Sequence, residues 1–213
     1  MCTAAIIAGG EARRLNGRVK GTLPFGTTSL VERQIAVLRA ITEKLLIITN
    51  NESAYTGLGV PAINDEIPGS GAIGGIYTAL VHATVDPVLV VACDMPFINE
   101  PFLRLLVNAD RSADVTIPKT ANGYEPMCAC YSRRCASRLR QQINSGALKI
   151  QELLPHLRVR EIGINEIAPH DPSGLLFSNV NTPDDYAKAL QHLDSGHSML
   201  SGPELPKKQN QTT

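Results

Sequence analysis

The sequence predicts an α/β protein, a three-layer sandwich in which helices cover both faces of a mostly parallel sheet. Apolar runs of strand length alternate with segments of helical periodicity along most of the chain, which is typical of such sheets. The first run, TAAIIA at residues 3–8, is continuously apolar, as expected of a strand buried on both faces. Ligands of these sheets bind at the carboxyl ends of the strands, so we expect functional residues directly after strands.

The amino-terminal half follows this alternation. A capping-box pattern, Ser29 with Glu32, begins the first helix, whose apolar residues recur on one face. Asn99 begins a later helix, because a cap residue stands just before a proline in the first turn. The other apolar segments are expected to form strands at 44–49, 60–63 and 88–92 and a helix at 74–83.

The carboxy-terminal half begins with a change of pattern near residue 113. Thr182-Pro183 begins a final helix, with acidic residues in its first turn where the helix dipole favours them. We expect one domain over residues 1–194 and, from its polar composition, a disordered tail over 195–213. The remaining elements are expected to be strands at 113–118 and 127–131, around a turn at Asn122-Gly123, and helices near 134–145 and 149–157.

Charge and cysteine content exclude several classes of protein. Lys and Arg number 20, as do Asp and Glu, so the net charge does not indicate a nucleic acid or a membrane surface as partner. No apolar run reaches transmembrane length and residues 1–8 are too short for a secretory signal, so we expect a cytoplasmic location. The 5 cysteines form neither a disulfide framework nor a zinc-ligand pattern.

The loop after the first strand, AGGEARRLNGRVKG, is the first candidate site. Gly9 and Gly10 let the backbone turn sharply and bring N–H groups close to an anion. Four cations follow within eight residues, namely Arg13, Arg14, Arg18 and Lys20. The combination predicts a triphosphate-binding loop, with a solvated basic loop as the alternative.

Two strand-end aspartates form the second candidate site. Asp94 follows the apolar run at 88–92, and Asp65 closes the short run at 60–63. A carboxylate in this position points into the ligand crevice and suits Mg²⁺ that also binds phosphate oxygens. We predict Asp94 as the Mg²⁺ ligand, while a turn or helix-cap role is the alternative for both aspartates.

The segment GSGAIG at residues 69–74 matches G-x-G-x-x-G, and Asp94 lies twenty residues after Gly74, which is formally a dinucleotide-binding pattern. In a Rossmann unit, however, the strand runs straight into the first glycine, whereas residues 65–68 intervene here. We therefore favour a flexible glycine loop that leads into a helix beside a nucleotide over an NAD site.

The segment NVNTPDD carries the last candidate site. Asn179 and Asn181 point to the same side of an extended chain, because side chains alternate along it. Two uncharged amides in this position could bind a polar acceptor, or they could satisfy backbone groups.

Five motifs follow one another along the chain, namely AGGEARRLNGRVKG, PGSGAIGGI, CDMPF, EPMCACY and NVNTPDDY. In these motifs and their order, the chain resembles the molybdenum cofactor guanylyltransferase family over about residues 4–193. The resemblance implies a Rossmann-like nucleotidyltransferase fold of the glycosyltransferase-A-like type. It implies transfer of GMP from GTP to molybdopterin with release of pyrophosphate, and hand-over of the product to molybdoenzymes or their chaperones. The glycine at position 9 favours GTP, since relatives that transfer CMP usually carry Ala-Ala-Gly.

The resemblance also implies roles for particular residues. It assigns Ala8, Gly9, Gly10 and Lys20 to the nucleotide-binding loop, Asp65 to the guanine nucleotide, Asp94 to Mg²⁺, and Asn179 and Asn181 to the pterin side. We predict Lys20, Asp94 and Arg14 as the catalytic residues, because in-line nucleotidyl transfer needs positioning and charge stabilisation. A CTP- or sugar-phosphate-dependent transferase of the same fold, and a non-catalytic nucleotide-binding module, stay open as alternatives.

Overall fold

The structure, a computed structural model, describes residues 1–9 and 19–194. Its main sheet has eight strands in the order β10-β7-β9-β6-β1-β4-β5, with β8 paired to β7. The strands are β1 (Thr3–Ile7), β2 (Pro24–Phe25), β3 (Thr28–Ser29), β4 (Leu45–Ile48), β5 (Ala62–Ile63), β6 (Val88–Ala92), β7 (Val115–Thr120), β8 (Gly123–Tyr124), β9 (Cys128–Tyr131) and β10 (Val159–Ile162). The helices are α1 (Leu30–Arg39), α2 (Gly71–His82), α3 (Glu100–Asn108), α4 (Ala136–Asn144), α5 (Ile164–Ile167) and α6 (Pro183–Asp194).

The sheet is mostly parallel, as predicted. Strands β4 and β6 both pair parallel with β1, β5 pairs parallel with β4, and β10 pairs parallel with β7. Strand β9 is inserted antiparallel between β6 and β7. The chain moves outward from β1 through β4 to β5 and then returns to the other side of β1 as β6. In sheets of this kind ligands bind where the strand order reverses, which here is at the carboxyl ends of β1 and β6.

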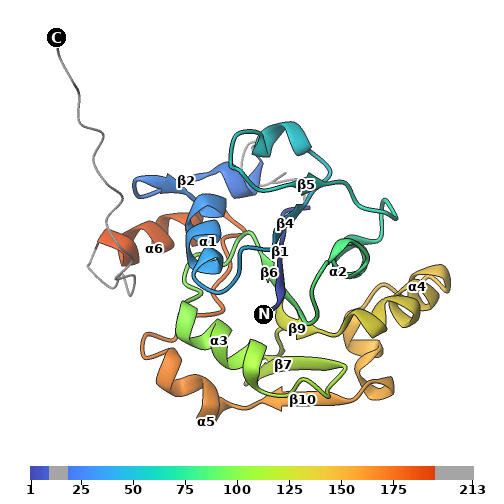
Figure 1. Cartoon of the computed structure of the whole chain (residues 1–213). Helices are drawn as coiled ribbons and strands as arrows, with labels where there is room; N and C mark the ends of the chain where they lie inside the picture. Colours follow the sequence, from blue (N-terminus) through green and yellow to red (C-terminus); the bar gives the residue numbers. More distant parts are fainter. Residues whose placement is uncertain (10–18, 195–213) are drawn as a thin grey trace.

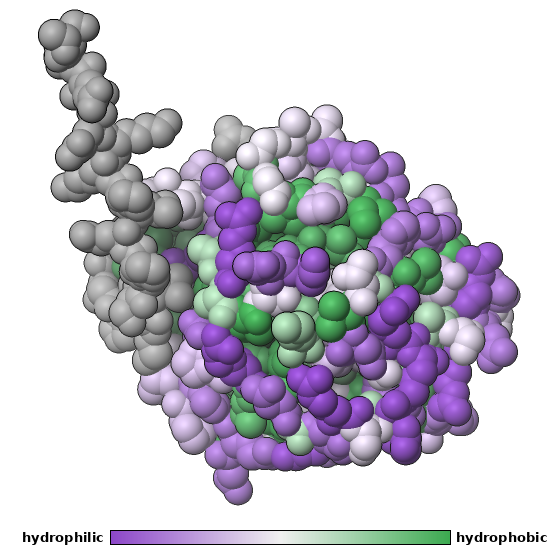
Figure 2. Space-filling view, viewed as in Figure 1, coloured by the Kyte–Doolittle hydropathy of each residue, from purple (hydrophilic) through white to green (hydrophobic). Residues whose placement is uncertain are grey.

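Different helices cover the two faces of the sheet, which confirms the three-layer arrangement (Figure 1). Helices α1 and α3 pack on one face, and α2 and α4 pack on the other. Strand β1 contributes Ala4 and Ile6 to the first core and Ala5 and Ile7 to the second. Its continuously apolar sequence is therefore explained by burial on both faces. Hydrophilic residues predominate on the face seen in Figure 2, with apolar residues between them.

A smaller apolar cluster joins the carboxy-terminal helix to the β2–β3 hairpin. Phe25 from the hairpin, Leu30 from α1 and Ala189 from α6 are buried together with Val180. The hydroxyl of Tyr186 donates a hydrogen bond to the carbonyl of Pro24. These contacts hold the segment before α6 close to the segment that precedes α1.

The predicted helix starts are confirmed by side-chain hydrogen bonds. In three helices the side-chain oxygen of the cap residue accepts a hydrogen bond from a backbone N–H three residues later. The cap and donor residues are Ser29 and Glu32, Asn99 and Phe102, and Thr182 and Asp185. The prediction of a helix at 149–157 is wrong. That segment forms two short 3₁₀ turns, η4 (Ile150–Glu152) and η5 (Leu154–His156), because Pro155 cannot stand in the interior of an α-helix.

Strand β10 and helix α5 were not predicted from the sequence, because both are short and mixed in polarity. No helix among residues 1–9 and 19–194 has the length and apolar character to cross a membrane. The cytoplasmic location stays a prediction, as does a domain boundary at residue 194. The tail expected at 195–213 lies outside the described residues.

Candidate active site

Three segments that are distant in sequence meet at the ammonium group of Lys20. Its Nζ lies 2.9 Å from Oδ2 of Asp94 and 2.8 Å from Oδ1 of Asn181, and it donates a hydrogen bond to each. The Lys20 and Asp94 side chains are only 17% and 15% exposed. A partly buried ion pair of this kind is screened less by solvent and salt than a surface pair. The predicted meeting of Lys20 and Asp94 is thus present.

Strand β6 and its neighbours fix the position of Asp94. The N–H of Cys93, the residue before it, donates to the carbonyl of Ile7 at the end of β1 over 3.0 Å. The carbonyl of Asp94 accepts from the N–H of Val180 over 2.9 Å. The backbone of the amide-bearing segment is therefore attached directly to the end of β6.

The two amides of that segment have different surroundings. Asn181 contacts Lys20, whereas Nδ2 of Asn179 donates to the carbonyl of Phe177 over 3.3 Å. Val180 between them is buried and both amides are exposed, as expected for alternating side chains. The structure therefore brings Asn181 to the ion pair, while Asn179 bonds to its own loop.

Lys20 begins the short 3₁₀ helix η1 (Lys20–Thr22), which packs against a buried tyrosine. A Cβ atom at Gly21 would lie 2.8 Å from the Tyr55 hydroxyl oxygen, which is too close for any side chain to fit without movement. Gly21 therefore lets the segment that carries Lys20 lie flat against Tyr55. The sequence shows this glycine only as the last residue of the basic loop.

Asp65 lies after β5, on the other side of β1 from Asp94. Its Oδ2 accepts from Nδ2 of Asn50 over 3.1 Å. Burial raises the pKa of the Asp65 carboxyl, and the Asn50 hydrogen bond lowers it in part. Cβ atoms at Gly9 and Gly75 would lie 3.8 and 3.9 Å from its carboxylate oxygens. Gly9, which follows Ala8 at the end of β1, thus lies beside Asp65 and the first turns of α2.

The glycine segment at 69–74 does not have the geometry of a dinucleotide-binding turn. Strand β5 ends at Ile63, and a loop intervenes before Gly69 and the start of α2 at Gly71. Gly69 and Gly71 have φ angles of 81° and 60°, which other residues rarely adopt. The preferred interpretation, a glycine loop leading into a helix, is the one the structure has.

Gln34 was missed by the sequence analysis. It is buried on α1, and its side-chain amide donates to the carbonyls of Ala92 and Met95, on either side of Asp94. It therefore positions the end of β6 from the α1 face. The signal was a polar residue at a helical position adjacent to the apolar stripe of Val31 and Ile35.

Part of the candidate site lies outside the described residues. This part comprises Gly10 and the three arginines Arg13, Arg14 and Arg18. Their proposed phosphate contacts stay predictions.

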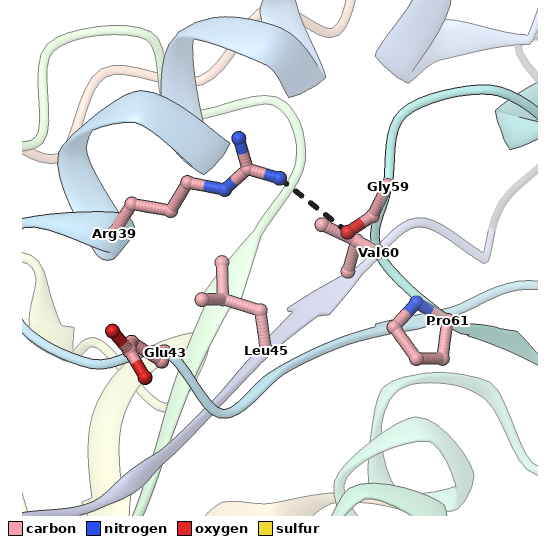
Figure 3. Close-up of a pocket in the computed structure, with 6 residues that line it drawn as sticks. All are labelled: Arg39, Glu43, Leu45, Gly59, Val60 and Pro61. Carbon is pink, nitrogen blue, oxygen red and sulfur yellow. Dashed lines mark hydrogen bonds between the residues drawn. The ribbon is translucent and has the colours of Figure 1, made fainter.

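A separate recess of about 370 Å³ lies at the opposite end of the sheet, near the start of β4 and the residues before β5 (Figure 3). Arg39 of α1 donates a hydrogen bond to the carbonyl of Gly59 across it. Its other lining residues are Glu43, Leu45, Val60 and Pro61. None of the predicted site residues within 1–9 and 19–194 lines it, so this recess is separate from the candidate site.

Comparisons with known proteins show which family this chain is similar to. A family model described as the MobA-like NTP transferase domain matches residues 4–160. A probable molybdenum cofactor guanylyltransferase from Clostridium perfringens is 33% identical over 193 residues, which are 89% of this chain and 96% of the relative. A molybdenum cofactor guanylyltransferase from Desulfosudis oleivorans is 28% identical over 195 residues, or 91% and 96% of the two chains. The crystal structure of molybdopterin-guanine dinucleotide biosynthesis protein A from Archaeoglobus fulgidus matches with a TM-score of 0.77 and 28% identity, covering 91% and 99% of the two chains.

Proposed function

The chain belongs to the MobA-like NTP transferase family and is a nucleotidyltransferase, and we propose that it transfers GMP from GTP to molybdopterin. The products are the guanine dinucleotide form of the cofactor and pyrophosphate. The observation that carries the proposal is the contact of Lys20 with both Asp94 and Asn181 at the point where the strand order reverses. A cation and two oxygen ligands are held there by three separate segments.

The proposed reaction is a direct displacement at the α-phosphorus of GTP. A terminal phosphate oxygen of the acceptor forms the new P–O bond, and the bond to the leaving pyrophosphate breaks. No enzyme nucleophile is needed, so the protein contributes orientation and charge stabilisation. Lys20 would neutralise charge on the β- and γ-phosphates, together with Arg14 and the N–H groups of Gly9 and Gly10.

The residues at the crevice fit a magnesium ion bound jointly with substrate. Asp94 offers a carboxylate and Asn181 an amide oxygen, both hard ligands, and both bind the cationic ammonium of Lys20 in the structure. Within the described part of the chain no three His, Cys, Asp or Glu side chains gather to hold a metal. Mg²⁺ commonly binds through one or two protein oxygens plus phosphates and water. When bound, it would supply positive charge at the α-phosphate, and Asp94 would hold it.

The guanine base would lie on the β5 side of the crevice. Asp65 is half-buried there beside Gly9 and Gly75, and an amide is its hydrogen-bond partner. Its carboxylate can accept two N–H groups from the 2-amino-4-oxopyrimidine edge that guanine presents, since a carboxylate has two acceptor oxygens. Cytosine and adenine lack this pair of donors, so this contact would favour GTP.

A pyrophosphate-release assay across the four NTPs, with and without molybdopterin, tests the proposal. We expect release with GTP only when both Mg²⁺ and molybdopterin are present. If pyrophosphate were released with CTP in preference to GTP, CTP and not GTP would be the nucleotide substrate. Release that does not depend on molybdopterin, or that requires a sugar phosphate instead, would refute the acceptor.

A further inference from the structure

We propose that Glu125 binds the acceptor, accepting hydrogen bonds from the 2-amino-4-oxopyrimidine edge of its pterin ring. The inference rests on the proposed function, because it takes the acceptor to be molybdopterin. It assigns a binding residue on the side of the crevice opposite Asp65.

The strand pairing places Glu125 near the carboxyl end of β6. Strand β9 runs antiparallel to β6, with Val91 opposite Cys128, and the N–H of Ala92 donates to the carbonyl of Met127 over 2.8 Å. The start of β9 therefore lies at the end of the sheet at which Asp94 stands. Glu125 stands just before the turn at residues 126–127 that leads into β9.

The backbone of Glu125 is fixed at this edge from two directions. Its N–H donates to the carbonyl of Pro118 in β7 over 3.0 Å, and its carbonyl accepts from the N–H of Cys128 over 3.1 Å. In the strand order, β9 and β5 lie on opposite sides of the β6–β1 pair. Glu125, before β9, and Asp65, after β5, consequently lie on opposite sides of the β6–β1 pair, at the end of the sheet that carries Asp94.

The Glu125 side chain has few partners for a half-buried carboxylate. Within the part of the chain that the structure describes, one hydrogen bond reaches it, from the Thr120 hydroxyl over 3.3 Å, and no ion pair involves it. The nearby Glu161 differs, since it pairs with Lys119 and accepts a hydrogen bond from the Tyr124 hydroxyl. Burial raises the pKa of the Glu125 carboxyl. A carboxylate in this state retains acceptor capacity that a ligand with N–H donors would satisfy.

The chemistry of the proposed reaction calls for two such carboxylates. Guanine and pterin present the same pair of donors, a ring N–H beside a 2-amino group, and the reaction joins one molecule of each kind. A planar donor pair on a carboxylate forms a strong and geometrically specific contact. Asp65 and Glu125 share three features: each carboxyl is partly buried, its pKa is raised by burial, and one uncharged side chain of the described residues donates a hydrogen bond to it. With Asp65 proposed for guanine, Glu125 is the counterpart for the pterin.

The test measures which ring edge the acceptor side recognises. The protein is saturated with Mg²⁺ and a GTP analogue with a methylene bridge between the α- and β-phosphorus, which fills the guanine side. Binding of 6-hydroxymethylpterin is then compared with that of 6-hydroxymethyl-lumazine, which carries oxygen in place of the 2-amino group. We expect the wild type to prefer the pterin by about 10- to 100-fold, the range for a hydrogen bond to a charged group.

Glu125→Gln should abolish this preference, because its amide replaces one acceptor oxygen with a donor. The matched control is Glu152→Gln, an exposed glutamate of η4, which should keep the wild-type preference. In turnover assays with molybdopterin, Glu125→Gln should raise KM for the acceptor by a similar factor and leave KM for GTP unchanged. An unchanged melting temperature would exclude a folding defect.

Two results would overturn the inference. One is a wild-type protein with equal affinity for the two probes, and the other is a Glu125→Gln variant that still prefers the pterin. Both are distinguishable from failure of the proposed function, which is read from wild-type pyrophosphate release with GTP and molybdopterin. If that release occurs and either result is found, Glu125 alone has been misassigned.

Discussion

Replacing Lys20 with alanine tests the ion pair on which the proposed mechanism depends. The Nζ–Oδ2 distance of 2.9 Å to Asp94 corresponds to an attraction of about 6 kcal/mol at an effective dielectric constant of about 20. Much of this is offset by the desolvation of both groups. The loss in transition-state stabilisation should therefore be nearer ~3 kcal/mol, which is roughly two to three decades in kcat/KM.

The same substitution should change metal binding in the opposite direction. In the structure the Lys20 ammonium lies between the Asp94 carboxylate and the Asn181 amide oxygen. Its removal frees both oxygens and removes a positive charge, so Mn²⁺ should bind more tightly to Lys20→Ala than to the wild type without nucleotide. Electron paramagnetic resonance of free Mn²⁺ measures this affinity. A general unfolding of the site would lower both turnover and metal affinity.

Lys44→Ala is the matched control, because Lys44 is exposed just before β4, at the opposite end of the sheet. It should leave both turnover and Mn²⁺ affinity unchanged. The reasoning fails if Lys20→Ala keeps wild-type kcat/KM. It also fails if the variant, still folded by circular dichroism, binds Mn²⁺ more weakly than the wild type.

Three further substitutions test the site and its support. Asp94→Asn should lower kcat/KM by about two to three decades and weaken Mn²⁺ binding measured by the same resonance method, since a neutral amide replaces the carboxylate. Gly75→Ala should lower the free energy of unfolding in urea by about 1–3 kcal/mol, because its Cβ would lie 2.8 Å from Cγ2 of Ile7; an unchanged value would show that α2 can shift. Ser29→Ala should cost about 1 kcal/mol at neutral pH through loss of the helix cap. Hydrogen bonds from the Ser29 hydroxyl and N–H lower the pKa of Glu32. The stability that these bonds give the folded protein is therefore present above the ordinary glutamate pKa, and it is lost as the pH falls through the lowered pKa of Glu32. The difference between Ser29→Ala and wild type should accordingly shrink in acid, and a difference that grows there would contradict this account.

Much of the fold could be predicted from the sequence, because the signals are local. The continuous apolar run of β1 indicates burial on both faces, and Ser29 and Asn99 indicate where helices begin. Each of these signals depends on residues that lie only a few positions apart in the sequence. The failure at 149–157 is also local, since Pro155 within this segment prevents an α-helix.

The candidate site was predicted in part for a similar reason. Lys20 and Asp94 each follow a strand, and parallel strands bring their carboxyl ends to one edge, so their meeting follows from topology. The contact between Lys20 and Asn181 could not be foreseen, because 161 residues separate them. It depends on the packing of α6 against the β2–β3 hairpin.

The sequence by itself determined most of the strands and helices, the caps that begin three of the helices, and which polar residues stand at strand ends. Only the tertiary structure decided that β9 is inserted antiparallel beside β6, that Asn181 rather than Asn179 reaches the ion pair, and that Glu125 lies opposite Asp65. The physical reason is the distance along the chain over which each kind of interaction acts. Backbone propensity and periodicity act over a few residues, whereas strand register and the packing of distant segments are set by contacts that form only when the whole core is assembled.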